Sequence, residues 1–180
     1  PRALVGKGRA LAMLDRPVEA ASIFDRALQL DPGNLEIWVR KGIVLDMMGR
    51  FDEAISCYEH ALTMQPHDAN AWFNLGITLL NKSEFEEAVK AFDQVLAIDP
   101  RNAEAYYNRG VALLDTKKYE KALMSFNKAV EIDDTVPEFW HSKGCVHGGL
   151  RDFYEAMRDL DKAICISPRF ATAGRTRGLC

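Results

Sequence analysis

Three side chains in the last third of the sequence could bind a metal ion. His141 and Cys145 are four residues apart, about one turn of a helix, and His147 follows shortly after. Neutral imidazole and thiolate are ligands that Zn²⁺ prefers in proteins. At about 100° per residue, however, His147 projects about 240° around a helix from His141, so the three cannot converge from one regular helix. We therefore predict packing or surface roles for them and no bound metal.

Adjacent carboxylates could do acid–base chemistry, and the sequence has such pairs at Asp52–Glu53 and Glu86–Glu87. Both pairs fall where a helix is predicted to begin, and negative charge there stabilises the helix dipole. Apart from Gly148–Gly149, no two glycines are adjacent, which excludes a glycine-rich nucleotide-binding loop. The sequence therefore predicts a protein that is not an enzyme and that has no cofactor.

Composition and charge argue against several further classes of protein. The 180 residues are 48% hydrophobic and 27% charged, with a net charge of −3, so neither nucleic acid nor an anionic membrane is an expected partner. No apolar stretch approaches the ~20 residues of a membrane span, and no signal peptide opens the chain. The cysteines form no C-x-x-C pair, and we predict free thiols in a cytoplasmic protein. They are Cys57, Cys145, Cys165 and Cys180.

An internal repeat sets the elements that position these side chains. Several positions recur every 34 residues without an insertion, which is typical of stacked helical hairpins. The recurring residues are a glycine (Gly8, Gly42, Gly76, Gly110, Gly144, Gly178), an alanine (Ala20, Ala54, Ala88, Ala122, Ala156), a large residue four positions later (Phe24, Tyr58, Phe92, Phe126, Leu160), and another four before the glycine (Leu4, Trp38, Trp72, Tyr106, Trp140).

Each repeat is predicted to form two antiparallel helices. In the third repeat one apolar stripe precedes a polar turn, a second stripe follows, and Asp99–Pro100 ends the second helix. Gly76 and Ala88 are expected where the two helices cross, because a larger side chain would push the backbones apart. The two stripes are Trp72, Leu75, Gly76, Leu79, and then Phe85, Ala88, Val89, Phe92, Leu96.

The pattern W-x2-L-G-x2-Y, followed by an alanine, an aromatic residue and a proline, resembles the tetratricopeptide repeat (TPR) family over the whole chain. The resemblance implies an all-α, right-handed superhelix, or solenoid, of helix-turn-helix hairpins. It also implies a concave groove lined by the first helices and a role as a protein–protein interaction scaffold. The predicted repeats are residues 1–34, 35–68, 69–102, 103–136 and 137–170, with a truncated sixth at 171–180, all in one continuous domain.

The fifth repeat departs from the pattern. Asp134 stands where a proline is expected, with Pro137 displaced by three residues, so its first helix should begin differently. His147 replaces a core leucine, and Gly148–Gly149 follows directly. Because each glycine costs a helix about 1 kcal/mol, we expect this helix to end frayed or kinked.

A second apolar stripe beside the first suggests a binding groove. It runs along the first helices of the second to fourth repeats, and the resemblance implies that it faces the concave side; alternatively, neighbouring helices cover it. Asn74 and Asn108 could hold a peptide backbone, as asparagine ladders do in glycosyltransferase and motor-adaptor members of the family, or they could simply be solvated. The predicted peptide-binding residues are Val39, Arg40, Ile43, Phe73, Asn74, Ile77, Leu80, Tyr107, Asn108, Val111, Leu114 and His141.

One known family function is disfavoured. Members that bind chaperone tails hold a terminal carboxylate with lysines, arginine and asparagines at set positions across three repeats. Here Val5 stands in place of the first lysine, and Asn70 and Asn74 occupy the later cationic positions. Glu104 and Glu138 replace cations in the other possible windows.

Three hypotheses for function are compatible with the sequence. The first is a scaffold that binds a peptide or a helix of a partner protein. The second is self-assembly into a homo-oligomer through the open ends of the array, since repeat arrays need polar capping ends. The third is that the array is the substrate-recruiting arm of a larger enzyme, such as a glycosyltransferase.

Overall fold

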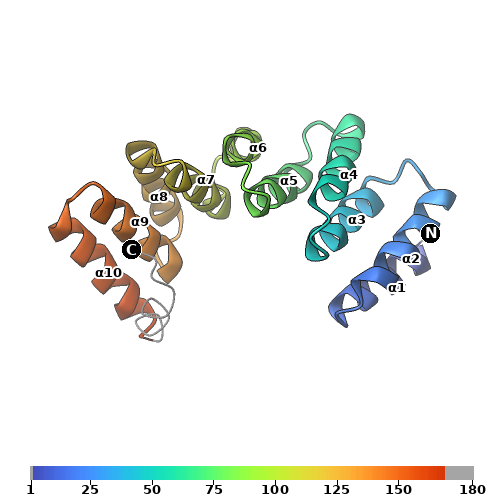
Figure 1. Ribbon diagram of the computed structural model, residues 1–180, viewed down its shortest axis with the longest axis horizontal. Helices are drawn as coiled ribbons and strands as arrows, with labels where there is room; N and C mark the ends of the chain where they lie inside the picture. Colours follow the sequence, from blue (N-terminus) through green and yellow to red (C-terminus); the bar gives the residue numbers. More distant parts are fainter. Residues whose placement is uncertain (1, 169–180) are drawn as a thin grey trace. The chain divides into compact units, whose positions relative to one another are not determined.

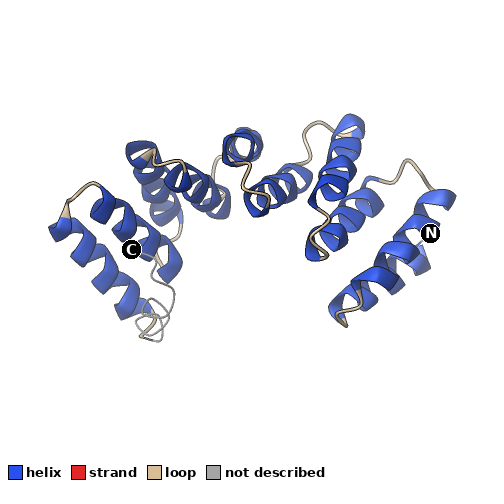
Figure 2. Cartoon of the chain, in the orientation of Figure 1, coloured by secondary structure: helices blue, strands red, loops and turns tan. Residues whose placement is uncertain are grey.

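The computed structural model describes residues 2–168, and within this range the chain forms ten α-helices and no strand (Figure 1; Figure 2). The predicted all-α array of helical hairpins is confirmed. The predicted start of a sixth repeat, 171–180, lies outside the described residues. Every helix within residues 2–168 is too short or too polar to span a bilayer.

Each 34-residue repeat contributes one hairpin of two helices, which we call its first and second helix. The first helices are α1 (Arg2–Met13), α3 (Leu35–Met47), α5 (Ala69–Asn81), α7 (Ala103–Asp115) and α9 (Pro137–Gly149). The second helices are α2 (Pro17–Leu30), α4 (Phe51–Met64), α6 (Phe85–Ile98), α8 (Tyr119–Ile132) and α10 (Phe153–Ile166).

The contacts divide the chain into two compact units, Pro1–Gln94 and Val95–Cys180, with the boundary inside α6. Each unit is described by itself. In unit 1, α3 contacts α1 and α5 in addition to the second helices α2 and α4. In unit 2, α9 contacts α7 in addition to α8 and α10. The first helices of each unit therefore lie side by side and form a surface that we call its first-helix face.

The first helices of the second to fourth repeats begin with the same kind of cap. The side chains of Asn34, Asp68 and Asn102 each accept a hydrogen bond from the backbone amide three residues later. Such a cap satisfies one of the amides that lack a partner at a helix start. The fifth repeat differs, as predicted: Val136 precedes α9 without a side-chain cap, and Pro137 takes the first helical position.

The turn inside each hairpin uses one residue with a left-handed backbone. The backbone amide of the next residue donates a hydrogen bond to the carbonyl five residues before it, for example from Arg50 to Leu45 at 2.9 Å. This pattern ends a helix sharply, and it favours glycine. Only the second repeat has a glycine there. The five residues, again 34 apart, are Asp15, Gly49, Ser83, Lys117 and Arg151.

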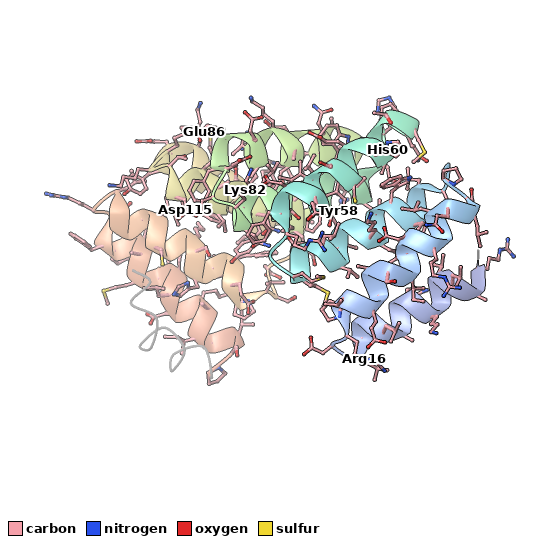
Figure 3. The ribbon with its side chains drawn as sticks, turned by 45° about the vertical axis from the view of Figure 1, so that its right-hand side comes forward. Arg16, Tyr58, His60, Lys82, Glu86 and Asp115 are labelled. Carbon is pink, nitrogen blue, oxygen red and sulfur yellow. The ribbon has the colours of Figure 1, made fainter. Side chains whose placement is uncertain are left out.

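In the first four repeats, the recurring glycine makes room for an aromatic ring from the second helix of the same hairpin. A Cβ at Gly42 would lie 2.6 Å from the Tyr58 ring, and one at Gly76 would lie 2.7 Å from the Phe92 ring. Both rings are fully buried, and Figure 3 marks Tyr58 within its hairpin. We predicted that Gly76 and Ala88 are small because the two backbones cross closely there; the structure instead places the ring of the second helix over the glycine. In the fifth repeat Leu160 replaces that ring.

The predicted break at Gly148–Gly149 is wrong. Helix α9 continues through Gly149 and is 13 residues long, the same length as α3, α5 and α7. The cost of two glycines falls on the last turn, which the left-handed residue Arg151 closes in the same way as in the other repeats. The tertiary contacts of α9 therefore outweigh the low helix propensity of its end.

Candidate functional site

The first-helix face of unit 1 carries most of the predicted apolar stripe. Ile43, Phe73, Ile77 and Leu80 are each half-buried, so part of every side chain reaches solvent. Val39 is only 3% exposed and lies in the core, so it offers no surface to a ligand. Neighbouring helices thus cover part of the stripe and leave part of it exposed, an outcome between the open groove and the fully covered stripe that the sequence allowed.

Phe73 belongs to the face and to the core at the same time. Its ring packs edge-on against the buried ring of Phe92, with centroids 5.8 Å apart. Edge-to-face ring pairs contribute about 0.5–1.5 kcal/mol beyond the area that they bury. Removing Phe73 would therefore weaken the hairpin as well as the face, so smaller side chains are better probes of binding.

Polar groups beside the stripe are held by their own helices. The Asn74 side-chain amide donates to the Asn70 carbonyl at 2.7 Å, which leaves its Oδ1 as an acceptor at the surface. The Arg40 guanidinium pairs with Glu36 at 2.7 Å. Asn74 can accordingly accept a hydrogen bond from a ligand, but its donors are already engaged.

Two hollows lie on the face of unit 1 between α1 and α3. The larger, about 910 Å³, has Arg2, Val5 and Arg9 on its α1 side. The smaller, about 240 Å³, is mainly apolar and includes Phe24. Arg9 borders both. Neither Arg2 nor Arg9 was predicted as a site residue; the available signal was their spacing of seven residues, which puts both on one face of a helix.

Unit 2 carries the remaining predicted residues. Tyr107, Val111 and Leu114 are half-buried on α7. The Tyr107 ring lies 5.0 Å from the Phe139 ring on α9 and 5.8 Å from the Phe126 ring on α8, measured between centroids. Tyr107 therefore joins three helices, and like Phe73 it serves the core and the face together.

Asn108 and His141 flank this part of the face. The Asn108 amide donates to the Glu104 carbonyl at 2.8 Å, so its Oδ1 is left as an acceptor, as in Asn74. Both ring nitrogens of His141 lie 3.9 Å from the Cys145 sulfur, and burial lowers the pKa of His141 below its ordinary value. A neutral imidazole at neutral pH follows.

The possible zinc ligands do not converge. His147 is buried inside the α9–α10 hairpin, away from the pair formed by His141 and Cys145. Among the residues that the structure describes, no group of three or more His, Cys, Asp or Glu side chains could hold a metal ion. The prediction of free thiols is confirmed for Cys57 and Cys165 but is wrong for Cys145, which is disulfide-bonded.

A buried charged cluster lies inside the fifth hairpin and was not predicted from the sequence. The Asp159 carboxylate is fully buried, with the Lys143 amine 3.3 Å away and the His147 Nδ1 3.6 Å away. Neither oxygen of Asp159 makes a hydrogen bond. The repeat itself carries the signal, because Asp159 occupies the position held by Ile23, Cys57, Ala91 and Ser125.

Comparison with solved structures identifies similar folds at low sequence identity. A MamA double mutant matches with a TM-score of 0.87 and 20% identity, covering 95% of this chain and 96% of that one. MamA residues 41–end from Desulfovibrio magneticus RS-1 match with a TM-score of 0.87 and 21% identity, covering 93% and 95%. YrrB, described as a TPR protein with an unusual peptide-binding site, matches with a TM-score of 0.79 and 22% identity, covering 98% of this chain and 91% of that one.

Family models settle the classification. Among curated proteins, none matches the sequence. Models described as tetratricopeptide repeat match residues 1–44, 39–100, 75–137 and 137–170, which together span most of the chain. These matches, the hairpin array and the recurring glycine–ring contact agree, and the chain belongs to the tetratricopeptide repeat family.

Proposed function

We propose that the protein is an interaction scaffold whose first-helix faces bind a peptide or a helix from a partner protein. The observation that carries the proposal is the second apolar stripe. Ile43, Ile77 and Val111 keep part of their apolar surface exposed, although the hairpins are already packed through a different stripe. Apolar surface arranged along helices suits the bulky anchors of an extended or helical ligand.

The amide groups add to this argument. The exposed Oδ1 atoms of Asn74 and Asn108 can each accept a hydrogen bond from a ligand backbone amide, since their nitrogens are engaged within the helix. Such contacts would orient a ligand without reading its sequence. The structurally similar YrrB, described as having a peptide-binding site, adds analogy and nothing more.

A non-catalytic role is part of the proposal. Acid–base chemistry needs groups that a substrate can reach. Lys143, His147 and Asp159 form the cluster of charged and titratable groups that is buried inside a hairpin, and none of them is more than 9% exposed. Their enclosure supports a structural role and weighs against catalysis at that position.

The test is a selection of random peptides on the immobilised protein, followed by affinity measurements with the enriched peptides. Ile77→Gln in unit 1 and Val111→Gln in unit 2 should each weaken the binding of peptides that use that unit by roughly tenfold, about 1.4 kcal/mol. Val89→Gln and Leu123→Gln are matched controls, since both are half-buried aliphatic residues on second helices.

The controls decide between a surface role and a packing role. Circular dichroism and thermal melting should show the same loss of stability for each variant and its control. If the controls weaken binding as much as Ile77→Gln and Val111→Gln do, or if no peptide is enriched, the first-helix faces are not the binding surface.

A second candidate function, self-association, is favoured by the surface of α10. Phe153, Tyr154 and Met157 are 66%, 77% and 66% exposed. In α8 the residue equivalent to Phe153 is Tyr119, which is half-buried and contacts Gly149 of the next first helix. An apolar face built to receive a helix is thus open among the described residues. Light scattering over a concentration range should detect dimers that Met157→Lys dissociates; a monomer at every concentration would contradict this candidate.

A further inference from the structure

Arg9 places a positive charge at both hollows on the face of unit 1. The side chain is exposed and borders both hollows between α1 and α3. Within the described residues Arg9 has no ion-pair or hydrogen-bond partner, in contrast to Arg40, which is neutralised by Glu36. An unpaired guanidinium next to two hollows can bind a carboxylate from a ligand, with two parallel hydrogen bonds.

The acidic residues nearby are already engaged. Glu36 is held by Arg40, and the Asp31 carboxylate accepts a hydrogen bond from the Asn34 side chain at 2.9 Å. Both line the larger hollow, together with Arg2 and Arg9. The charge left for a ligand is therefore positive, but the two carboxylates would repel the dense phosphates of a nucleic acid along the same surface.

The smaller hollow adds a requirement for an apolar side chain. It is lined by Ala12, Met13, Phe24, Ile43 and Val44 between the two arginines, Arg9 and Arg40. Its volume of about 240 Å³ is large enough for one leucine, isoleucine or methionine side chain. Arg9 lies at its rim, so a carboxylate bound there would come from a residue next to the apolar one.

We propose that the partner segment bound by unit 1 carries an aspartate or glutamate adjacent to a large aliphatic residue. The carboxylate pairs with Arg9, and the aliphatic side chain fills the smaller hollow. This inference rests on the proposed function and adds the chemical class of the ligand. It differs from capture of a terminal carboxylate, because Val5 and Asn70 leave that arrangement without its cations.

The random-peptide selection tests this inference when it is repeated with Arg9→Glu. On the unmodified protein, enriched peptides should contain an acidic residue beside leucine, isoleucine or methionine at several times its frequency in the library. On Arg9→Glu, the acidic residue should be lost from the enriched peptides and replaced by lysine or arginine. The control is Arg26→Glu on the exposed side of α2, which changes the net charge equally and should leave the selected pattern unchanged.

Each other outcome overturns the inference in a recognisable way. Peptides enriched without an acidic residue, or the same peptides on Arg9→Glu, would leave the proposed function intact and refute the role of Arg9. No enrichment at all would refute both. Binding of a single-stranded RNA oligonucleotide that Arg9→Glu abolishes would assign the charge to a different class of partner and refute the inference as well.

Discussion

The second and fifth hairpins are built on the same 34-residue pattern but have opposite interiors. In the α3–α4 hairpin, the inner positions hold Leu45 and the thiol of Cys57, and burial raises the pKa of Cys57 to about 11. In the α9–α10 hairpin, the same two positions hold His147 and Asp159. One interior is neutral, and the other contains a buried carboxylate with two basic neighbours.

Both hairpins have a lysine at the same position of the repeat, but the two side chains point in different directions. Lys41 reaches outward to Asp25 on α2 at 2.7 Å, and that carboxylate is half exposed. Lys143 instead reaches inward to Asp159 at 3.3 Å and is itself buried. Exposed pairs contribute about 0–1 kcal/mol, whereas breaking a buried pair costs several. The comparison teaches that a uniform repeat tolerates a polar interior where the charges balance one another.

The largest expected effect comes from breaking that balance. Asp159→Ala should reduce the free energy of unfolding by about 3–5 kcal/mol, because Lys143 is left buried without its counter-charge. Urea denaturation followed by circular dichroism measures it. The third hairpin offers the matched apolar set, Leu75, Leu79 and Ala91. The triple variant Lys143→Leu, His147→Leu, Asp159→Ala should regain most or all of the loss; if it is as unstable as Asp159→Ala, the charge argument fails.

A smaller difference is expected at the glycines. A Cβ at Gly42 would lie 2.6 Å from the Tyr58 ring, which is fully buried and cannot move aside. Gly42→Ala should therefore cost about 1–3 kcal/mol. At Gly144 the nearest atoms, in Leu160 and the Ala156 carbonyl, are 3.0 and 3.2 Å away, so Gly144→Ala should cost less, with the gain in helix propensity offsetting the contact. Equal losses in thermal melting would remove this distinction between the hairpins.

The end of α9 provides a matched pair of single substitutions. A Cβ at Gly148 meets no atom within 4 Å, so Gly148→Ala should stabilise the protein by about 0.5–1 kcal/mol through helix propensity. A Cβ at Gly149 would lie 2.9 Å from the Tyr119 ring, and Gly149→Ala should gain less or destabilise. Denaturation midpoints report both values. A loss at Gly148 would show that this helix end needs its flexibility.

The smallest effect on stability, and the clearest chemical one, concerns the thiols. Burial raises the pKa of Cys57 to about 11, so at pH 8 the native protein should react with a thiol reagent at the exposed Cys165 and very slowly at Cys57. Because the folded pKa of Cys57 is raised, its contribution to stability is complete below about pH 9 and is lost as the pH rises towards 11. Mass spectrometry of the labelled protein measures both rates; equally fast labelling of Cys57 would contradict its burial.

Much of the fold could be predicted from the sequence, because the repeat multiplies each weak local signal by five. The site was less accessible to prediction. Ile43 and Ile77 lie on the predicted face, but Val39, one turn before Ile43, is buried by neighbouring helices. Helical periodicity gives the direction of a side chain from its own helix and carries no information about how closely the next helix approaches. Arg9 was not predicted because its importance depends on two hollows between helices and on nearby carboxylates that are already engaged by other side chains.

The sequence by itself determined the period, the alternation of first and second helices, and the recurrence of small residues at fixed positions of each hairpin. These follow from the spacing of apolar and small residues along one chain, which local geometry converts into helices and faces. Only the tertiary structure decided that Lys143 points inward while Lys41 points outward, and that Arg9 has no partner within residues 2–168. A flexible charged side chain can reach several places, and the neighbours that compete for it come from other helices.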